Sequence, residues 1–378
     1  MQRPKKNNKS NMNAAHQFYT LSVKEVVSLS ADTVKLVFAV PEALKEQFSY
    51  ISGQYLTLRF QLNGQEERRA YSLCSSPVLD QDLAVAVKRV PQGLVSNHIN
   101  DQVKAGDQLE VMPPEGHFVA QPQADEKKDY FLFGGGSGLT PLLSILKSII
   151  ELAPKSRVFL YYQNRTEESI LFREELDRLE KRYAGQLLVQ HILSQPKTES
   201  SGGFMGLFAK KSRNWKGEVG RIDAKKASRF IKEHQAADGR PVELYLCGPA
   251  GLMDAAQKAA QNLGLEQVHR EWFNADETPK NEVKAQANAK VYARIDGEDF
   301  EVVLQKKESI LDGLRRVGAD APFSCMAGTC SSCMAKVEEG SVEMERCLAL
   351  DEEEIAEGFV LSCQSKPTSP IVRINFDV

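Results

Sequence analysis

Four cysteines carry the clearest chemistry in this sequence. Cys325, Cys330 and Cys333 lie within nine residues in the spacing C-x4-C-x2-C, and Cys363 follows after a long gap. This is the spacing of the ligands of a 2Fe-2S cluster, in which four thiolates hold two irons. Because such a cluster accepts and releases one electron at a time, the spacing predicts an electron-transfer function.

The residues between the cysteines suit a loop that curls around a cluster. Gly328 allows the backbone to approach inorganic sulfide closely. Small residues at Ala327, Thr329, Ser331 and Ser332 leave space and offer hydroxyl and N–H donors to sulfur. The residue types of the loop therefore agree with the spacing of its cysteines.

Two other uses of these cysteines stay open. A structural zinc site usually takes its ligands from two separate C-x2-C pairs, whereas three of the four cysteines here crowd into one loop. Two disulfides would need an oxidising compartment, but the chain has seven cysteines, an odd number, and no amino-terminal signal peptide is visible. The spacing favours the cluster over both alternatives.

Length and composition indicate a cytoplasmic protein of several domains. A chain of 378 residues is too long for one ordinary core and suits two or three domains. Hydrophobic residues make up 42% and charged residues 26%, as in soluble globular proteins. Apolar runs stay far short of the roughly 20 residues that cross a bilayer, so we expect no membrane insertion.

Charge is distributed unevenly along the chain. Residues 289–378 carry 10 Lys and Arg against 17 Asp and Glu, a balance of −7, whereas residues 1–288 carry 38 against 34, a balance of +4. An acidic domain suits docking on a basic partner surface, although solubility alone would also explain it.

The composition of residues 1–15 predicts a disordered tail. Its four basic residues lack aromatic neighbours, so we expect no nucleic-acid partner.

A small antiparallel β-barrel is predicted for residues 16–123. Short alternating segments are separated there by turn residues, which is typical of such barrels. The predicted strands are Tyr19–Val27, Thr33–Ala39, Tyr55–Leu62, Arg69–Leu73, Leu83–Arg89 and Gln108–Met112.

Two segments of this barrel could bind a phosphate-bearing ligand. The strand motif Arg69-Ala70-Tyr71-Ser72 presents a pyrophosphate ligand, a stacking face and a hydrogen-bond donor. The segment Gly93-Leu94-Val95-Ser96 opens a short helix, whose free N–H groups can hold phosphate. Taken alone, the strand motif is also compatible with an ordinary edge strand.

Residues 124–273 predict a parallel α/β domain that binds a dinucleotide. A buried strand, Tyr130–Phe133, leads through a glycine turn into an apolar helix, Leu142–Leu152. The turn contains Gly136-x-Gly138-x-Thr140-Pro141, which lets a cofactor approach the backbone, although a glycine run can also be only a tight turn. Further expected elements are the strands Arg157–Gln163, Leu187–Leu193 and Val242–Cys247 and the helices Phe172–Tyr183 and Ala250–Leu263.

The strand that ends at Cys247 continues into Gly248-Pro249. The carboxyl end of a parallel strand is where open α/β sheets bind ligands, so Cys247 is a candidate for ligand binding, although a buried structural thiol is the alternative.

Residues 198–217 look like a surface insertion, and a mobile loop is favoured there over a flap that contacts a partner.

The last part of the chain predicts a linker and a third domain. Residues 274–289 are small, polar and marked by proline, as linkers are. In residues 290–378 we expect strands at Lys290–Ile295, Phe300–Leu304 and Cys333–Glu338 and a helix at Ser309–Val317.

Taken together, these motifs resemble the ferredoxin-NADP reductase family. R-x-Y-S, G-x-x-S and the later P-x-G-x-F resemble its flavin domain, and G-x-G-x-T-P with Cys-Gly-Pro resembles its nicotinamide domain. Residues 290–378 resemble the β-grasp fold of plant-type ferredoxins. The expected fold is therefore multidomain, α+β and α/β, and the order of domains is similar to that of reductase components of bacterial oxygenases.

The resemblance implies roles for the flavin residues. Arg69 would bind the flavin pyrophosphate, Tyr71 would pack on the ring or ribityl chain, and Ser72 would approach flavin N5. The turn Gly93–Ser96 would hold phosphate, and Phe273 would be the aromatic residue near the flavin.

The resemblance also implies roles for residues that bind the nucleotide. Thr140 would contact the nicotinamide nucleotide, and Cys247 would lie beside the nicotinamide ring. Relatives that use NADP often have Ser-Arg where this chain has Ser194-Gln195, so the phosphate would be left to Arg165. We expect FAD, a 2Fe-2S cluster and NADPH, with NADH as the alternative.

These sites together predict an electron-transfer enzyme. A flavin converts the two-electron chemistry of a nicotinamide into single electrons for a cluster, and the expected acceptor is an oxygenase or epoxidase component. A stand-alone ferredoxin-NADP reductase or diaphorase would share every motif. A non-catalytic redox sensor would not need the nucleotide motifs, which argues against it.

Overall fold

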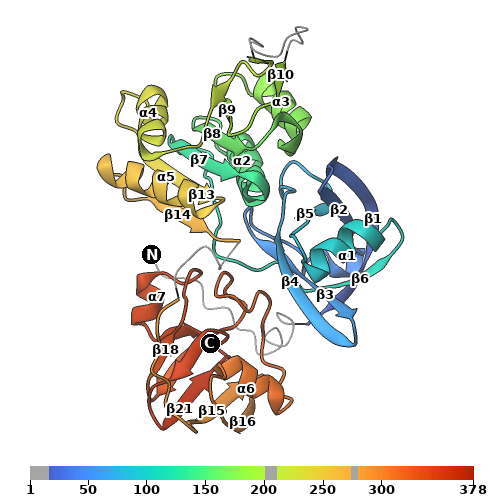
Figure 1. The fold of residues 1–378 in the computed structure, drawn as a ribbon, viewed down its shortest axis with the longest axis vertical. Coiled ribbons are helices and arrows are strands. Elements are labelled where there is room, and N and C mark those ends of the chain that lie inside the picture. The colour runs from blue at the N-terminus through green and yellow to red at the C-terminus, as the bar shows by residue number, and fades with distance from the viewer. Residues whose placement is uncertain (1–16, 201–210, 274–279) are drawn as a thin grey trace.

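The computed structural model describes residues 17–200, 211–273 and 280–378. In Figure 1 they form a barrel domain in blue and cyan, an α/β domain in green and yellow, and a third domain in orange and red. The predicted tail at 1–15, residues 201–210 of the insertion at 198–217 and the first part of the linker at 274–289 lie outside the described residues.

The barrel domain is a six-stranded antiparallel sheet in the order β4-β3-β6-β1-β2-β5. All six predicted strands are confirmed. A nine-residue helix, α1 (Leu94–Gln102), follows β5, where the sequence predicted a helix. The strands are β1 (Tyr19–Ser30), β2 (Thr33–Ala39), β3 (Tyr55–Leu62), β4 (Gln65–Ser72), β5 (Leu83–Lys88) and β6 (Gln108–Val111).

Strand β4 begins four residues earlier than the sequence predicted. Asn63 and Gly64 both have positive φ, 53° and 77°, and form a tight hairpin turn between β3 and β4. The ladder therefore starts at Gln65, within a polar run that has no hydrophobic alternation. Because β4 lies at the edge of the sheet, its charged side chains can reach solvent or a neighbouring domain.

The α/β domain contains a parallel sheet in the order β12-β9-β8-β7-β13-β14. Its strands are β7 (Asp129–Gly135), β8 (Arg157–Asn164), β9 (Leu187–Leu193), β12 (Glu218–Val219), β13 (Val242–Cys247) and β14 (Val268–Glu271). Its helices are α2 (Leu139–Leu152), α3 (Arg173–Arg182), α4 (Ala224–His234) and α5 (Ala250–Asn262). The sequence did not predict β12, β14 or α4.

Helices cover both faces of this sheet, because β7 is apolar on both sides. Tyr130 and Leu132 join the core beneath α2 and α3, whereas Phe131 and Phe133 join the core beneath α4 and α5. A strand that is covered on both faces is typical of parallel sheets. Because β7 is buried in this way, the turn that follows it is fixed at the carboxyl edge of the sheet.

The third domain has a five-stranded sheet in the order β16-β15-β21-β17-β19. Its last strand runs parallel to β15 in the middle of the sheet. Residues 281–286 lie along this domain, because the amides of Asn281 and Gln286 donate to Glu345 O and Pro367 O, each at 2.8 Å. The elements are β15 (Lys290–Ile295), β16 (Glu298–Val303), α6 (Ile310–Arg316), β17 (Met334–Glu339), β18 (Val342–Met344), α7 (Glu352–Ala356), β19 (Phe359–Leu361), β20 (Ser365–Pro367) and β21 (Ile371–Asn375).

A buried ion network joins the barrel to α2. Lys147 has a side chain only 5% exposed, and its ammonium lies 3.1 Å from Asp80 of the barrel and also pairs with Glu175 of α3. Ser144 Oγ donates to Ser75 O at 2.6 Å close by. These contacts hold the barrel and the α/β domain in one orientation. Among the described residues, no helix is both long and apolar enough to cross a membrane.

Replacing Lys147 with Met should lower the free energy of unfolding by about 1–3 kcal/mol, because two carboxylates would lose their shared cation. The loss stays moderate since Asp80 and Glu175 are partly exposed. Chemical unfolding measures it. Lys155→Met, at an exposed lysine, is the matched control, and equal stability of the two variants would contradict the assignment.

Candidate functional site

The barrel and the α/β domain meet at three residues that end their strands. Ser72 ends β4, and its hydroxyl donates to Glu271 Oε2 at 3.0 Å. Glu271 ends β14 and is paired with Cys247, the last residue of β13. The structure thus brings the predicted Ser72 and Cys247 to one junction, with Glu271 between them.

A glycine turn lies against the same junction. A Cβ atom on Gly138 would lie 2.2 Å from Cys247 O, and one on Gly135 would lie 2.6 Å from Pro249. Only glycine permits this close approach of the turn after β7 to the segment Cys247-Gly248-Pro249. Gly136 has φ +55° and turns the chain into α2.

The first turn of α2 contains Thr140 and Pro141, which complete the predicted motif Gly136-x-Gly138-x-Thr140-Pro141. Thr140 and Pro141 are both buried, and Thr140 Oγ1 donates to Ser137 O at 3.0 Å. The helix starts at Leu139, before the predicted Leu142, because the preceding 3-10 turn Gly136–Gly138 runs directly into it. The predicted helix start is therefore wrong by three residues.

The predicted flavin residues lie along β4 and at the start of α1. Arg69 has a side chain 43% exposed and pairs with Glu67 at 2.9 Å; Tyr71 packs on the barrel core. Alternation along the strand places Arg69 and Tyr71 on one face and Ala70 and Ser72 on the other.

The segment Gly93–Ser96 forms a closed turn at the start of α1. Ser96 Oγ accepts the amide of Val90 at 3.1 Å, and a Cβ on Gly93 would lie 2.6 Å from that oxygen. Leu94 and Val95 are the first two helical residues, so their amides are among those without a helical acceptor. Such amides suit a phosphate group.

The four predicted ligand cysteines of the third domain lie in two pairs. Cys325 lies beside Cys330, and Cys333 lies beside Cys363. In the parts of the chain that the structure describes, no three His, Cys, Asp or Glu side chains converge on one metal-ion position. Two pairs of thiols fit the four ligands of two irons.

Backbone geometry around the sulfurs also fits a cluster. The amide of Cys325 points to Cys330 Sγ at 3.4 Å, and the amide of Ala327 points to Cys325 Sγ at 3.3 Å. Gly328 has φ +78°, and a Cβ there would lie 3.0 Å from Gln364. Hydrogen bonding from Cys330 lowers the pKa of the Cys325 thiol, which favours the thiolate. All seven cysteines are free, so disulfides are not formed.

Comparison with protein families agrees with this geometry. Residues 20–119 match the oxidoreductase FAD-binding domain, residues 132–258 the oxidoreductase NAD-binding domain, and residues 293–368 the 2Fe-2S iron-sulfur cluster binding domain. One component of the 1,2-phenylacetyl-CoA epoxidase of Escherichia coli is 38% identical, over 95% of this chain and 98% of its own. The chain belongs to this family of oxygenase reductases.

Other members are similar over nearly their whole length. The ferredoxin reductase component of 3-ketosteroid-9-alpha-monooxygenase from Rhodococcus rhodochrous is 37% identical, over 94% of this chain and 96% of its own. Phthalate dioxygenase reductase shares the fold, with a TM-score of 0.54 and 24% identity over 95% of this chain and 98% of its own. The protein is thus an oxidoreductase with FAD, NAD and 2Fe-2S domains, as the sequence predicted.

Glu271 is the residue of this reductase site that sequence reasoning missed. Burial raises the pKa of Glu271 to about 8, and the hydrogen bond from Ser72 only partly opposes this rise. Burial also raises the pKa of the Cys247 thiol well above its usual range. Both groups are therefore mainly protonated at neutral pH. A lone glutamate in Glu-Trp-Phe is the only sequence signal, and by itself it marks no more than the end of the domain.

The loops after β8 and β9 bring together Arg165 and Ser194, the remaining residues that the sequence predicted to bind the nucleotide. Ser194 N donates to Asn164 O at 2.9 Å, and Gln195 N donates to Arg165 O at 2.8 Å. Both side-chain polar atoms of Asn164 are buried without a hydrogen bond among the described residues. Polar atoms of this kind fit a bound polar group at the carboxyl edge of the sheet.

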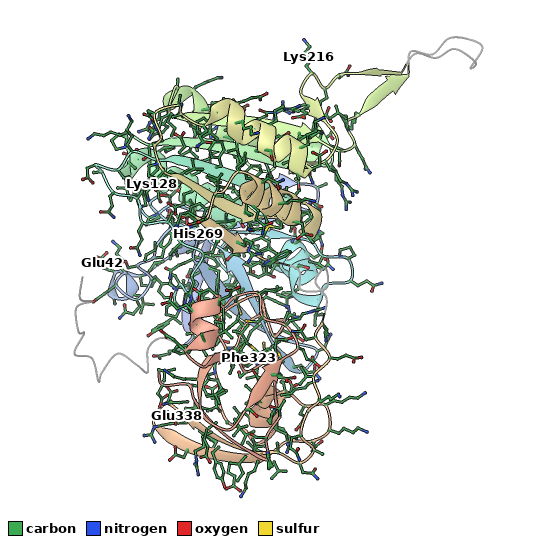
Figure 2. The ribbon with its side chains drawn as sticks, turned by 90° about the vertical axis from the view of Figure 1, so that its left-hand side faces the viewer. Glu42, Lys128, Lys216, His269, Phe323 and Glu338 are labelled. Atoms are coloured by element: carbon green, nitrogen blue, oxygen red, sulfur yellow. The ribbon has the colours of Figure 1, made fainter. Side chains whose placement is uncertain are left out.

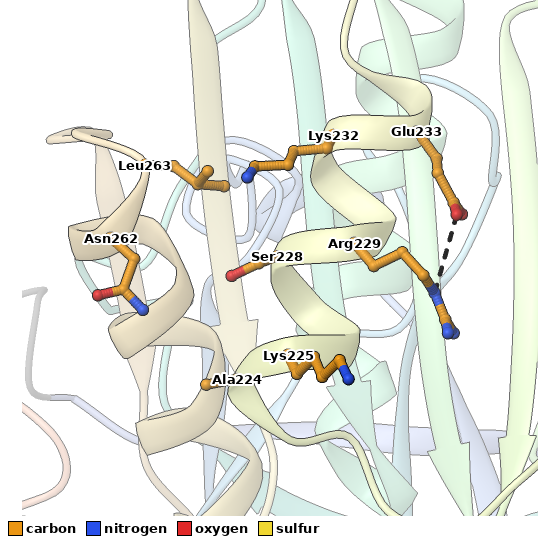
Figure 3. Close-up of a pocket in the computed structure, with 8 residues that line it drawn as sticks. All are labelled: Ala224, Lys225, Ser228, Arg229, Lys232, Glu233, Asn262 and Leu263. Atoms are coloured by element: carbon orange, nitrogen blue, oxygen red, sulfur yellow. Dashed lines mark ion pairs between the residues drawn. The ribbon is translucent and has the colours of Figure 1, made fainter.

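Two further features concern the surroundings of this junction. Phe273, the predicted aromatic residue, is 44% exposed beyond the end of β14. A groove of about 620 Å³ lies between α4 and α5 and contains none of the predicted site residues (Figure 3). Its cationic residues are Lys225, Arg229 and Lys232, and Arg229 pairs with Glu233.

Replacing Glu271 with Gln should change the pH dependence of stability. Between about pH 4.5 and pH 8 the unfolded chain ionises Glu271 while the folded chain keeps its proton, so wild-type stability falls as pH rises. The slope is at most about 1.4 kcal/mol per pH unit. The variant lacks this titration.

Unfolding free energies of both proteins across that window test the prediction. Glu266→Gln, at an exposed glutamate of the same domain, should follow the wild-type profile. Parallel profiles for wild type and Glu271→Gln would show that Glu271 does not titrate in this range.

Proposed function

We propose that this reductase takes electrons from NADPH, or alternatively NADH, and supplies them singly to an oxygenase of the phenylacetyl-CoA epoxidase type. The observation that carries the proposal is the contact of Ser72 with Glu271 beside Cys247, which brings the flavin strand to the nucleotide edge. When bound, FAD supplies two-electron chemistry with the nicotinamide and one-electron chemistry with the 2Fe-2S cluster.

The protein's residues bind and orient these groups. Arg69 binds the flavin pyrophosphate as a cation on an accessible strand edge, and the amides of Gly93–Ser96 hold phosphate. Tyr71 would pack against the flavin, Ser72 would lie near its N5, and Phe273 would shield the ring. These roles are supported by the exposure of Arg69 and the closed turn at Ser96.

Nucleotide binding is assigned to the turn after β7 and to its neighbours. The glycines Gly136 and Gly138 would let the dinucleotide approach the backbone, and Thr140 and Pro141 lie in the first turn of the helix that follows. Cys247-Gly248-Pro249 borders the nicotinamide ring. Arg165 and Ser194 lie on adjacent loops, which supports a shared role near the adenosine end.

Cys325, Cys330, Cys333 and Cys363 are the proposed cluster ligands, on the strength of their arrangement in two pairs. We assign residues 16–123 to the flavin domain, 124–273 to the nucleotide domain and 290–378 to the cluster domain. The cytoplasm is the proposed location, since the cysteines outside the ligand set, Cys74, Cys247 and Cys347, are free thiols, which suit a reducing compartment.

The acceptor assignment rests on the relative that serves a phenylacetyl-CoA epoxidase. A stand-alone reductase or diaphorase is the second candidate, because such an enzyme would share the flavin, nucleotide and cluster motifs. Purified protein mixed with the oxygenase component of a phenylacetyl-CoA epoxidase distinguishes them: the proposal expects NAD(P)H-dependent turnover of the oxygenase, and a stand-alone enzyme would reduce only small acceptors.

Cys330→Ser should separate flavin reduction by NAD(P)H from electron transfer through the cluster. Flavin absorbance should still bleach with NAD(P)H, whereas transfer to a cluster-dependent acceptor should fall to background, because one ligand is lost. Cys347→Ser removes a cysteine of the same domain outside the ligand set and should retain transfer. Iron analysis of the wild type should give about two irons per chain; zinc in place of iron would refute the cluster.

A further inference from the structure

Tyr55 connects the flavin side of the barrel with the cluster loop, defined here as residues 324–333. It lies at the start of β3, directly opposite Ser72 of β4 in the antiparallel ladder. Residues opposite each other point to the same face of a sheet, with Cβ atoms about 5 Å apart. Tyr55 therefore stands beside the residue that contacts Glu271 of the nucleotide domain.

A hydrogen-bonded unit crosses the domain boundary at this point. The Tyr55 hydroxyl lies 2.8 Å from Ser332 Oγ, and Ser332 Oγ donates to Glu115 Oε2 at 2.9 Å. A serine hydroxyl has one proton, so Tyr55 must be the donor to Ser332. Two backbone hydrogen bonds of 2.8 and 3.0 Å join Tyr55 to Glu115. The three residues thus hold one another in place.

Packing fixes the tyrosine ring. Tyr55 is only 4% exposed, so its hydroxyl cannot exchange the serine for bulk water. Gly116 lies against the ring, where a Cβ would come within 2.9 Å of two ring carbons. The ring therefore has little room to move away from Ser332.

A second contact lies two residues further along β3. Thr57 Oγ1 donates to Ser324 Oγ at 3.0 Å, and both side chains are buried. Ser324 immediately precedes Cys325, and Ser332 immediately precedes Cys333. The contacts from β3 therefore hold the cluster loop at both ends, each time next to a predicted ligand.

Other contacts attach the cluster domain outside this loop. The guanidinium of Arg68 lies 4.1 Å from the ring centre of Phe323 and 3.6 Å from Asp320. Figure 2 shows Phe323 where the cluster domain meets the barrel. Because these contacts do not involve Tyr55, removing its hydroxyl affects the position of the loop rather than attachment of the whole domain.

We propose that Tyr55 is a positioning residue for electron transfer from the flavin domain to the cluster domain. Its hydroxyl fixes the cluster loop beside the barrel edge that carries Ser72, and electron transfer slows steeply as the separation of two redox groups grows. The inference rests on the proposed function and adds a residue outside all the binding motifs.

Tyr55→Phe in the holoenzyme tests the proposal by two measurements. Loss of one buried hydrogen bond should raise hydrogen–deuterium exchange at amides of residues 324–333 about two- to tenfold. After flavin reduction, electron transfer to the cluster should slow by a comparable factor, while flavin reduction by NAD(P)H keeps its rate. Tyr50→Phe is the matched control, because the Tyr50 hydroxyl bonds Ser75 within the barrel at 2.9 Å.

The other outcomes are also decisive. Unchanged exchange and unchanged transfer in Tyr55→Phe would overturn the proposal, and so would faster exchange with unchanged transfer. If that variant does not fold, Thr57→Val tests the loop through the second contact with the same expected changes. A wild-type protein that reduces its flavin but never its cluster would instead refute the proposed function.

Discussion

The hairpin of β3 and β4 is the constraint on which the arrangement of the sites depends. Its edge strand β4 ends at Ser72, which bonds Glu271 of the nucleotide domain. Its inner strand β3 contacts the cluster loop through Tyr55 and Thr57. Because the two strands are in one ladder, neither junction can shift without moving the other. The flavin motif therefore lies where the two other domains approach the barrel.

The two junctions of the barrel differ in their physical character. The junction with α2 contains the buried Lys147 with two carboxylates, together with apolar residues of the barrel and the helix in one core. The junction with the cluster domain includes hydroxyl pairs, the hydrogen bond from Ser332 to Glu115, the Arg68 contacts, and the approach of His117 Nδ1 to Glu354 Oε1 at 3.2 Å. Separating buried charges from their partners is costly. When the domains separate, the hydroxyls of the second junction gain water as a partner at smaller cost, so the second junction is the more readily opened of the two.

Sequence patterns predicted the helices and strands that have strong hydrophobic periodicity. They failed for strands that are formed by polar residues. The apolar strands and the cysteine spacing were sufficient for three domains of the correct type. The start of β4 lies in a charged run, and β14 is a short edge strand, so neither has the alternation that prediction needs. Glu271 and Tyr55 could not be identified from sequence because their roles come from contacts with other domains, across 199 and 277 residues of sequence.

The pairing of the cysteines shows how the fold adds to what spacing can predict. Spacing identifies four ligands but does not tell which thiols are neighbours. Strand β17 begins directly after Cys333, and β19 ends two residues before Cys363; Met334 is paired with Leu361 in their ladder. Ser362 N also donates to Cys333 O at 3.0 Å. The sheet therefore brings the distant cysteine to Cys333, while Cys325 and Cys330 meet within their own loop. One pair is made by tertiary structure and the other by local curvature, so the arrangement of both pairs requires the folded domain as a whole.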